Sequence, residues 1–389
     1  MDIKFIRENT EKVKKATTAK QLDPKLVDKL LELDEKRRKL ILEVEVLRAK
    51  RNKIAEAKKA SEEGREIKEE LKVKEPKLKK VDEDYKKTLF EIPNPPAPDV
   101  KEGKNDTENE VVRKHGMPKK FGFKVKDHLE LGEALGIIDV ERAAKVSGAR
   151  FGYLKGDAVL LEMALINFAF ETLLKEGFTP VIPPVLIKTE SMKGMGYMEH
   201  SGDEQMYIFD KDDLVLVGTS EQSIGPMHMG EVLDAAKLPL RYMGFSTCFR
   251  REAGTYGKDT RGILRVHQFD KVEMFSYTLP EDSDKEHEFL LSLEEKFLQA
   301  LEIPYQVIKM CSGDLGAPAA RKYDLEAWIP SQDKYRELTS ASTCTDFQAR
   351  RLNIKYQDGE RIDYLHMLNG TAFAIGRTII AILENFQEK

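Results

Sequence analysis

Cysteine and long apolar runs are both scarce in this 389-residue sequence. The three cysteines, Cys248, Cys311 and Cys344, are far apart, odd in number and form no CxxC pair, which argues against a disulfide framework and against a zinc site. No run approaches the ~18 apolar residues that a membrane span needs. The N-terminal MDIKFIRENTEKVKK resembles neither a signal peptide nor a transit peptide. These absences predict a soluble cytoplasmic protein with no membrane partner.

The two common phosphate-binding loops and any excess of positive charge are also missing. Neither GxxxxGK[ST] nor GxGxxG occurs, so a phosphate site would have to be built from side chains. The formal net charge is −4, so contact with nucleic acid would require a local patch. At roughly 100–200 residues per domain, the length predicts two or three domains.

Residues 26–91 differ in pattern from everything after them. Apolar residues recur at spacings of three and four from 30 to 54 and again from 67 to 92, as in helices that share one seam. The polar AEAKKASEEGRE between the two series contains Gly64, which predicts the turn of an antiparallel helical hairpin. With 20 basic and 17 acidic residues, the hairpin suits either a solvated coiled coil or a nucleic-acid contact. Four polar residues take the remaining seam positions: Arg37, Arg51, Lys74 and Thr88.

Prolines divide the chain in two places. Pro76 predicts a kink or break in the second helix, because proline removes a backbone donor and clashes one turn back. IPNPPAPD (92–99) ends the hairpin and begins a linker. We therefore expect one domain over 1–98 and a second over 99–389.

The second domain mixes helices with short strands. Helices are expected over 157–176 and 281–301, and strands over the runs 178–187, 214–219, 241–249, 264–277 and 303–310. Strands separated by irregular loops predict an antiparallel α+β domain.

The stretch FRREAGTYGKDTRGILRVHQF (249–269) places cationic residues around a glycine-rich loop. Residues two apart share a face of a strand, so Arg250 and Glu252 should point the same way. Five residues of the next strand should share one face: Arg265, His267, Phe269, Lys271 and Glu273. Arginine binds phosphate and an aromatic ring stacks on a base, which favours a nucleoside triphosphate site. A surface ladder of ion pairs with Phe269 in the core is the alternative.

The segment NGTAFAIGRTIIAILENF (369–386) is typical of a strand that enters a buried helix. Arg377 lies at the junction and needs a partner there, because an unpaired buried charge is costly. That partner is either a ligand or a carboxylate such as Glu384.

Several long motifs together resemble one family. Residues 244–275 are similar to motif 2 of the class II aminoacyl-tRNA synthetases in their seryl-tRNA synthetase form, and 369–387 to motif 3. VGTSEQ (217–222) resembles the serine-binding segment and YRELTSASTCTDFQARR (335–351) the nucleotide-side segment. FTPVIPPVLI (178–187) resembles motif 1, which lies at the dimer interface of this class. The resemblance spans the chain and implies a class II sheet flanked by helices, with an N-terminal coiled-coil arm.

The resemblance assigns roles to individual residues. Three catalytic residues are implied: Arg250 on the α-phosphate, Arg377 on the γ-phosphate and Glu252 on the adenine side. Arg251, Val266 and Phe269 join the ATP site, with Phe269 stacked on adenine. Four further residues would line the site of ATP and its Mg²⁺: Glu337, Leu338, Thr339 and Ser340. Of these, Glu337 and Ser340 would bind the Mg²⁺. Seven residues would bind serine: Thr219, Ser220, Glu221, Arg250, Glu273, Asn369 and Thr371.

The implied reaction is ATP-dependent ligation of L-serine to tRNA(Ser) by a homodimer, with tRNA(Sec) left open as a second substrate. The arm would grip the tRNA, and the loop with Lys258, Asp259 and Arg261 would meet the acceptor end. Zinc is not expected. The arm is shorter than in many bacterial relatives, which puts tRNA affinity in question.

Three other functions remain in view. A synthetase for threonine, proline or glycine would carry an anticodon-binding domain after motif 3, where this sequence has 12 residues after Arg377 (389 − 377). An amino-acid ligase for a carrier protein would lack the arm. A non-catalytic tRNA-binding protein would not need Arg250, Glu273 and Arg377.

Overall fold

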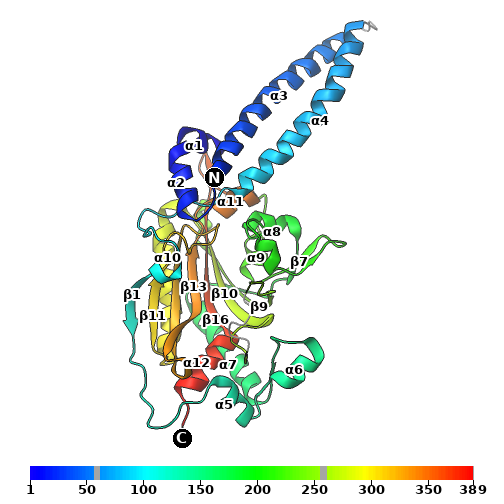
Figure 1. Ribbon diagram of the computed structural model, residues 1–389. Coiled ribbons are helices and arrows are strands. Elements are labelled where there is room, and N and C mark those ends of the chain that lie inside the picture. Colours follow the sequence, from blue (N-terminus) through cyan, green and yellow to red (C-terminus); the bar gives the residue numbers. More distant parts are fainter. Residues whose placement is uncertain (57–61, 255–260, 389) are drawn as a thin grey trace. The chain divides into compact units, whose positions relative to one another are not determined.

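The computed structural model describes residues 1–56, 62–254 and 261–388, and its internal contacts separate two compact units, Met1–Pro95 and Pro96–Lys389 (Figure 1). Each unit has a hydrophobic core of its own. Across the described ranges, no helix combines the length and apolarity that crossing a bilayer requires. All three cysteines are buried and unbonded to one another.

Within residues 1–56 and 62–95, the regular structure of the first unit is helical. The helices are α1 (Ile3–Glu8), α2 (Thr10–Ala19), α3 (Lys25–Glu56) and α4 (Glu62–Glu91). Asp2 caps α1 by accepting a hydrogen bond from the Lys4 amide, which satisfies a donor at the helix start. A small apolar core closes the base of the hairpin, where its buried members meet: Ile6, Val13, Val27, Leu30, Tyr85 and Ile92.

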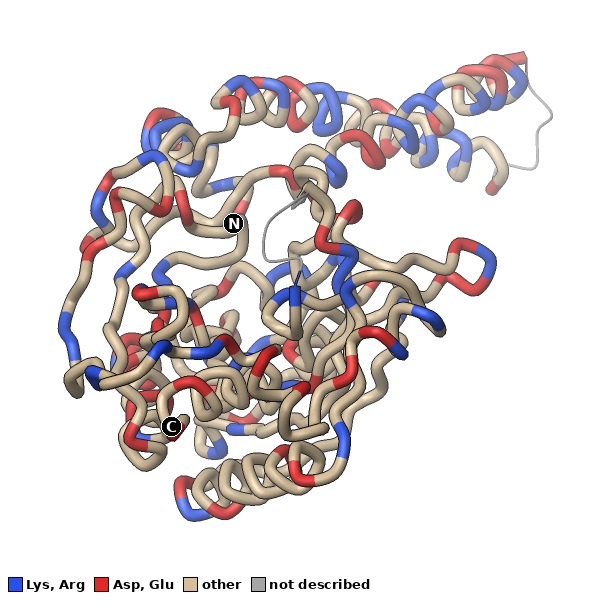
Figure 2. Tube along the Cα trace, turned by 60° about the horizontal axis from the view of Figure 1, so that its bottom comes forward, with Lys and Arg blue, Asp and Glu red and all other residues tan. Residues whose placement is uncertain are grey.

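The predicted hairpin is confirmed as α3 and α4, which pack along their length. Val44, Leu47, Ile67 and Leu71 form an apolar cluster within it. Ion pairs fill two of the seam positions that the sequence leaves polar. The Arg37 Nε lies 2.6 Å from the Asp82 carboxylate, and the Lys74 Nζ lies 2.6 Å from that of Glu43. Figure 2 shows both signs of charge distributed along these helices.

Pro76 does not break the second helix, so that part of the expectation was wrong: α4 continues through it to Glu91. An internal proline costs ~3 kcal/mol, but burial of Leu71 and Val81 on either side holds the helix together. Gly64 lies inside α4, so the expectation that it belongs to the turn was wrong. Residues 57–61 of the expected turn segment lie outside the described ranges.

The second unit is built on a largely antiparallel sheet of eight strands, as predicted. In spatial order the strands are β1 (Glu110–His115), β11 (Tyr305–Lys309), β12 (Arg321–Ile329), β13 (Lys334–Thr343), β16 (His366–Ala374), β10 (Gln268–Thr278), β9 (Leu240–Phe249) and β4 (Thr179–Val181). Among the described strands of this sheet, β4 pairs in parallel with β9 and the other pairings are antiparallel. Small sheets surround it: β2 (Ile138–Asp139) with β3 (Tyr153–Leu154), β5 (Leu186–Lys188) with β7 (Leu214–Leu216) and β6 (Ile208–Phe209), and β8 (Val232–Asp234) with β14 (Lys355–Asp358) and β15 (Arg361–Tyr364).

Three helices cover one face of the large sheet: α7 (Asp157–Lys175), α10 (Ser283–Ala300) and α12 (Ile375–Asn385). They confirm the helices expected over 157–176, 281–301 and after the last strand. The short helices are α5 (His128–Ala134), α6 (Val140–Ser147), α8 (Thr189–Met195), α9 (Glu221–Ile224) and α11 (Phe347–Leu352).

The alternation along β10 separates the two faces of the sheet. Val272 and Met274 point into the helix-covered core. Lys271 and Glu273, on the opposite face, line cavities. This assignment of sides follows from the two-residue repeat of a strand.

The strand starts later than the sequence suggested. It begins at Gln268, so the expectation that Arg265 and His267 share its face was wrong. Both precede the strand in irregular chain, where the His267 ring nitrogen Nδ1 lies 2.9 Å from the Arg250 carbonyl.

Candidate active site

Two adjoining cavities open on the face of the sheet opposite the three helices. The first is lined by residues of β10, β13, β16 and the start of α12. The second encloses about 530 Å³ and extends toward α9, a size usual for small-molecule sites. Six charged residues line both: Arg250, Glu252, Arg265, Lys271, Glu337 and Arg377.

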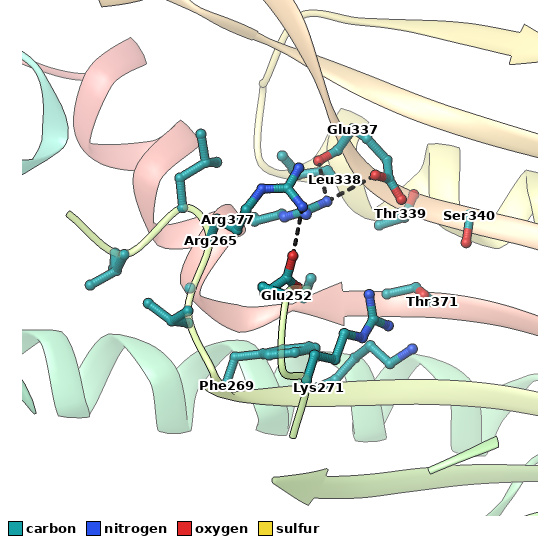
Figure 3. A pocket seen from close by; sticks show the side chains of 16 residues that line it. Glu252, Arg265, Phe269, Lys271, Glu337, Leu338, Thr339, Ser340, Thr371 and Arg377 are labelled. Atoms are coloured by element: carbon teal, nitrogen blue, oxygen red, sulfur yellow. Dashed lines mark hydrogen bonds and ion pairs between the residues drawn. The ribbon is translucent and has the colours of Figure 1, made fainter. Parts of the chain in front are cut away.

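Arg377 and Glu337 face each other across the first cavity from α12 and β13 (Figure 3). The Arg377 guanidinium donates to the Glu337 carboxylate at 3.1 Å and to its carbonyl at 3.0 Å. Partial burial opposes ionisation of Glu337, whose side chain is 46% exposed, but the charges of Arg377 and Lys322 outweigh it and lower the pKa of Glu337 to about 2. The alternative partner Glu384 is excluded, since it accepts from the His128 and Ser331 amides instead.

Glu252 and Arg265 form a second ion pair at the mouth of this cavity, at 2.7 Å (Figure 3). Glu252 has a φ of 51°, a left-handed conformation that costs a residue with a side chain and is held only by its surroundings. The Arg250 guanidinium lies 5.2 Å from the centre of the Phe269 ring and donates to the Gly218 carbonyl at 3.1 Å. Ion pairs are therefore present, as the ladder alternative required, but they line a cavity.

Glu273 is held by two neighbours at one carboxylate oxygen. Its Oε2 lies 2.6 Å from the Lys271 Nζ and accepts a hydrogen bond from the Thr371 hydroxyl at 3.1 Å. Thr371 stands directly across the β10–β16 ladder from Glu273, so strand pairing sets this contact. Lys271 and Glu273 are both at least nine-tenths buried.

Glu221 is held in a different way, by neutral donors. Its Oε1 accepts from the Tyr197 hydroxyl at 2.8 Å, the Asn369 amide at 3.0 Å and the Gln348 amide at 3.2 Å. Burial and the nearby charge of Glu273 raise the pKa of Glu221 to about 7, against the lowering effect of these donors and of Lys271. Two carboxyls therefore line one polar cavity with different partners.

Most of the expected site residues meet in these cavities, and a few do not. The first cavity brings together Val266, Phe269, Leu338, Thr339, Ser340 and Thr371 with the charged residues, and the second adds Thr219, Glu221, Glu273 and Asn369. Arg251 lies outside both linings, over the Tyr207 ring. Ser220 is fully buried and donates to the Gly244 carbonyl. Lys258 and Asp259 lie outside the described residues.

The chemistry of the donors around Glu337 suits a hard cation that arrives with phosphates. Glu337 offers an ionised carboxylate and Ser340 a hydroxyl in the same cavity, and Mg²⁺ prefers one or two protein oxygens with phosphate and water completing its shell. Among residues 1–56, 62–254 and 261–388, no group of three or more His, Cys, Asp or Glu is placed to hold a metal alone.

Sequence reasoning missed Tyr197 and Gln348 and gave Lys271 no role. Tyr197 follows α8 and Gln348 lies on α11, so both reach Glu221 from segments distant in sequence. Only Lys271 had a local signal, its two-residue spacing from Glu273 on a strand.

Comparison with known proteins agrees with this geometry. Residues 206–386 match the family described as tRNA synthetase class II core domain (G, H, P, S and T), and residues 1–96 match the seryl-tRNA synthetase N-terminal domain. Serine–tRNA ligase 1 of Streptomyces avermitilis is 50% identical over 399 residues, covering 100% of this chain and 93% of the relative. Serine–tRNA ligase of Dictyoglomus turgidum is 47% identical, covering 100% and 94%.

A solved structure gives the same result. The crystal structure of seryl-tRNA synthetase from Pyrococcus horikoshii complexed with ATP superimposes with a TM-score of 0.91 at 43% identity, covering 100% of this chain and 94% of that one. Full-length identity of this order to several serine–tRNA ligases places the chain among them. This chain belongs to the seryl-tRNA synthetase family.

Proposed function

We propose that this chain activates L-serine with ATP and transfers the serine to the 3′ end of tRNA(Ser). One observation carries the proposal. The buried carboxyls of Glu221 and Glu273 line a cavity that is continuous with the cavity of Arg250 and Arg377. An amino acid held by its ammonium group at the carboxyls would place its own carboxylate toward the arginines, where a triphosphate fits.

The first step needs no general base, because the serine carboxylate is already ionised at neutral pH. One of its oxygens attacks the α-phosphorus of ATP, the bond from that phosphorus to the bridging oxygen breaks, and pyrophosphate leaves. Arg250 offsets charge at the α-phosphate and Arg377 at the γ-phosphate, so that positioning and electrostatics supply the catalysis. A terminal hydroxyl of the tRNA then attacks the carbonyl carbon of seryl-adenylate, and AMP leaves.

The proposal includes Mg²⁺, for which Glu337 and Ser340 are the proposed protein ligands. When bound with ATP it would neutralise phosphate charge. Of this chain's residues, Glu337 would bind it through an ionised carboxylate, and Arg377 would be released from its contact with Glu337 toward the phosphates.

The hairpin of α3 and α4 is proposed to hold the tRNA through phosphate and 2′-hydroxyl contacts. Its exposed surface carries both signs of charge (Figure 2), which favours recognition by shape over a strong general affinity for anions. Such contacts weaken as salt rises, because binding releases counterions. Serylation of tRNA(Sec) in parallel assays decides whether that tRNA is a second substrate.

A homodimer is proposed from an exposed apolar surface on α7. Val159, Leu160 and Met163 are 39%, 67% and 47% exposed on one helix, and adjacent apolar exposure of this kind marks an interface. We expect sedimentation to give twice the chain mass and Leu160→Asp to shift it toward the single chain. A wild-type protein that sediments at the single-chain mass would contradict the proposal.

Serine-dependent ATP–pyrophosphate exchange tests the activity directly. We expect exchange with serine and much slower exchange with alanine and glycine, which lack the hydroxyl and leave polar groups of the pocket unpaired. Exchange with threonine should also be slow, because its additional methyl group has to be rejected sterically. Absence of exchange with serine would refute the proposed function.

A further inference from the structure

The Glu221 carboxylate shows an asymmetry that its expected role does not explain. Three donors converge on Oε1, from Tyr197, Gln348 and Asn369. The other oxygen, Oε2, accepts no hydrogen bond from any residue in the part of the chain that the structure describes. A buried carboxylate is costly unless both oxygens are satisfied, so this arrangement has the character of a site that a ligand completes.

Glu273 shows the same asymmetry by other means. Its Oε2 takes both Lys271 and Thr371, and its Oε1 has no partner among the described residues. With Glu221 ionised, the two glutamates and Lys271 carry a net charge of −1. An ammonium group placed between the two glutamates therefore balances this local charge.

We infer that Tyr197 and Gln348 are positioning residues for substrate, which fix Glu221 by one oxygen and leave the other for the substrate ammonium group. This inference rests on the proposed function. Tyr197 contributes a hydroxyl from the chain after α8, and Gln348 contributes an amide from α11. Gln348 also donates to the Met195 carbonyl at 3.3 Å, so it ties Glu221 to the end of α8.

The groups around Glu221 have opposing effects on the pKa of its carboxyl, which supports this role. Burial and Glu273 favour the protonated carboxyl, whereas Tyr197, Lys271 and Gln348 favour the carboxylate. The pKa of Tyr197 itself is raised well above its ordinary value by burial and by the adjacent Glu221, so its hydroxyl keeps its proton and donates. Removing that hydroxyl should both loosen Glu221 and favour its neutral form, which binds an ammonium group poorly.

Tyr197→Phe removes only the hydroxyl, and Gln348→Met removes only the amide at similar length. We expect each to raise KM for serine about ten- to hundredfold, as for a lost hydrogen bond to a charged group, with kcat and KM for ATP within about twofold of wild type. Ethanolamine keeps the ammonium and hydroxyl groups of serine but lacks the carboxylate. Its inhibition constant should rise by the same factor in each variant. Tyr364→Phe, on β15 outside both cavities, is the matched control.

The pH profile separates positioning from a general structural effect. In wild type, kcat/KM for serine should fall as pH drops through about 7, because Glu221 takes up a proton. In Tyr197→Phe that fall should begin at higher pH. The inference would be overturned if the variants left both the KM for serine and the inhibition by ethanolamine unchanged. It would also be overturned if the KM for serine and the KM for ATP rose equally. In either case normal exchange by the wild-type protein would leave the proposed function standing, whereas its absence would refute that function.

Discussion

Replacing Arg250 by alanine is expected to lower the rate of serine-dependent ATP–pyrophosphate exchange about 10²–10³-fold, the cost of losing one preorganised group that stabilises transition-state charge. The guanidinium lies over Phe269 and lines both cavities. It is therefore placed to act where the serine carboxylate and the α-phosphate meet. Exchange at saturating serine and ATP measures the effect.

Two controls make that result specific to the reaction. Arg361→Ala removes an arginine that is 59% exposed on β15 and pairs with Asp363, so exchange should stay within about twofold of wild type. The melting temperature of Arg250→Ala should remain near that of wild type, because the side chain is only partly buried and donates its hydrogen bond to the Gly218 carbonyl. Exchange by Arg250→Ala within tenfold of wild type would contradict the assigned role.

Shortening the hairpin should separate the two halves of the reaction. Deleting residues 44–73 and joining Glu43 to Lys74 through a Gly-Gly turn uses a point where the side chains of these two residues already meet across the helices, with the Lys74 Nζ 2.6 Å from the Glu43 carboxylate. The basal core of Ile6, Val27 and Tyr85 is retained. We expect kcat/KM for tRNA(Ser) serylation to fall by about two orders of magnitude or more, because phosphate contacts dominate nucleic-acid affinity.

Exchange of pyrophosphate should be unchanged by the same deletion, since the cavities belong to the other compact unit. Arg250→Ala is the reciprocal control, with exchange lost and tRNA binding retained. Loss of both activities in the shortened chain would argue against separate roles for the two units.

Local pattern was sufficient to predict several elements, although not the effect of Pro76 or the start of β10. Three-four spacing predicted α3 and α4, and the junction at Arg377 was placed correctly between β16 and α12. Motif resemblance brought Arg250, Glu273 and Thr371 to one region without any long-range geometry.

Other features depend on contacts between distant segments. The register of β10 against β16 shifts between Val272 and Glu273, so Thr371 and Ala374 both line the first cavity although they are three residues apart. A strict two-residue alternation from Thr371 would have placed Phe373 in the first cavity, but Phe373 is fully buried in the core. Tyr197 and Gln348 could not be predicted either, because only the folded sheet brings them to Glu221.

The ion pairs of the hairpin have a consequence for how the arm responds to solution conditions. From Arg37 to Arg48 on α3, partly exposed side chains bridge to α4, whereas the base has an apolar core and an ion pair of Arg7 with the buried Asp34, which salt screens less. Exposed ion pairs weaken as the Debye length shortens, from ~8 Å at physiological ionic strength to ~3 Å at 1 M, and apolar contacts do not. Ionic strength therefore acts on the middle of the arm as well as on its grip on RNA, which makes the arm a salt-tuned element attached to a salt-tolerant base.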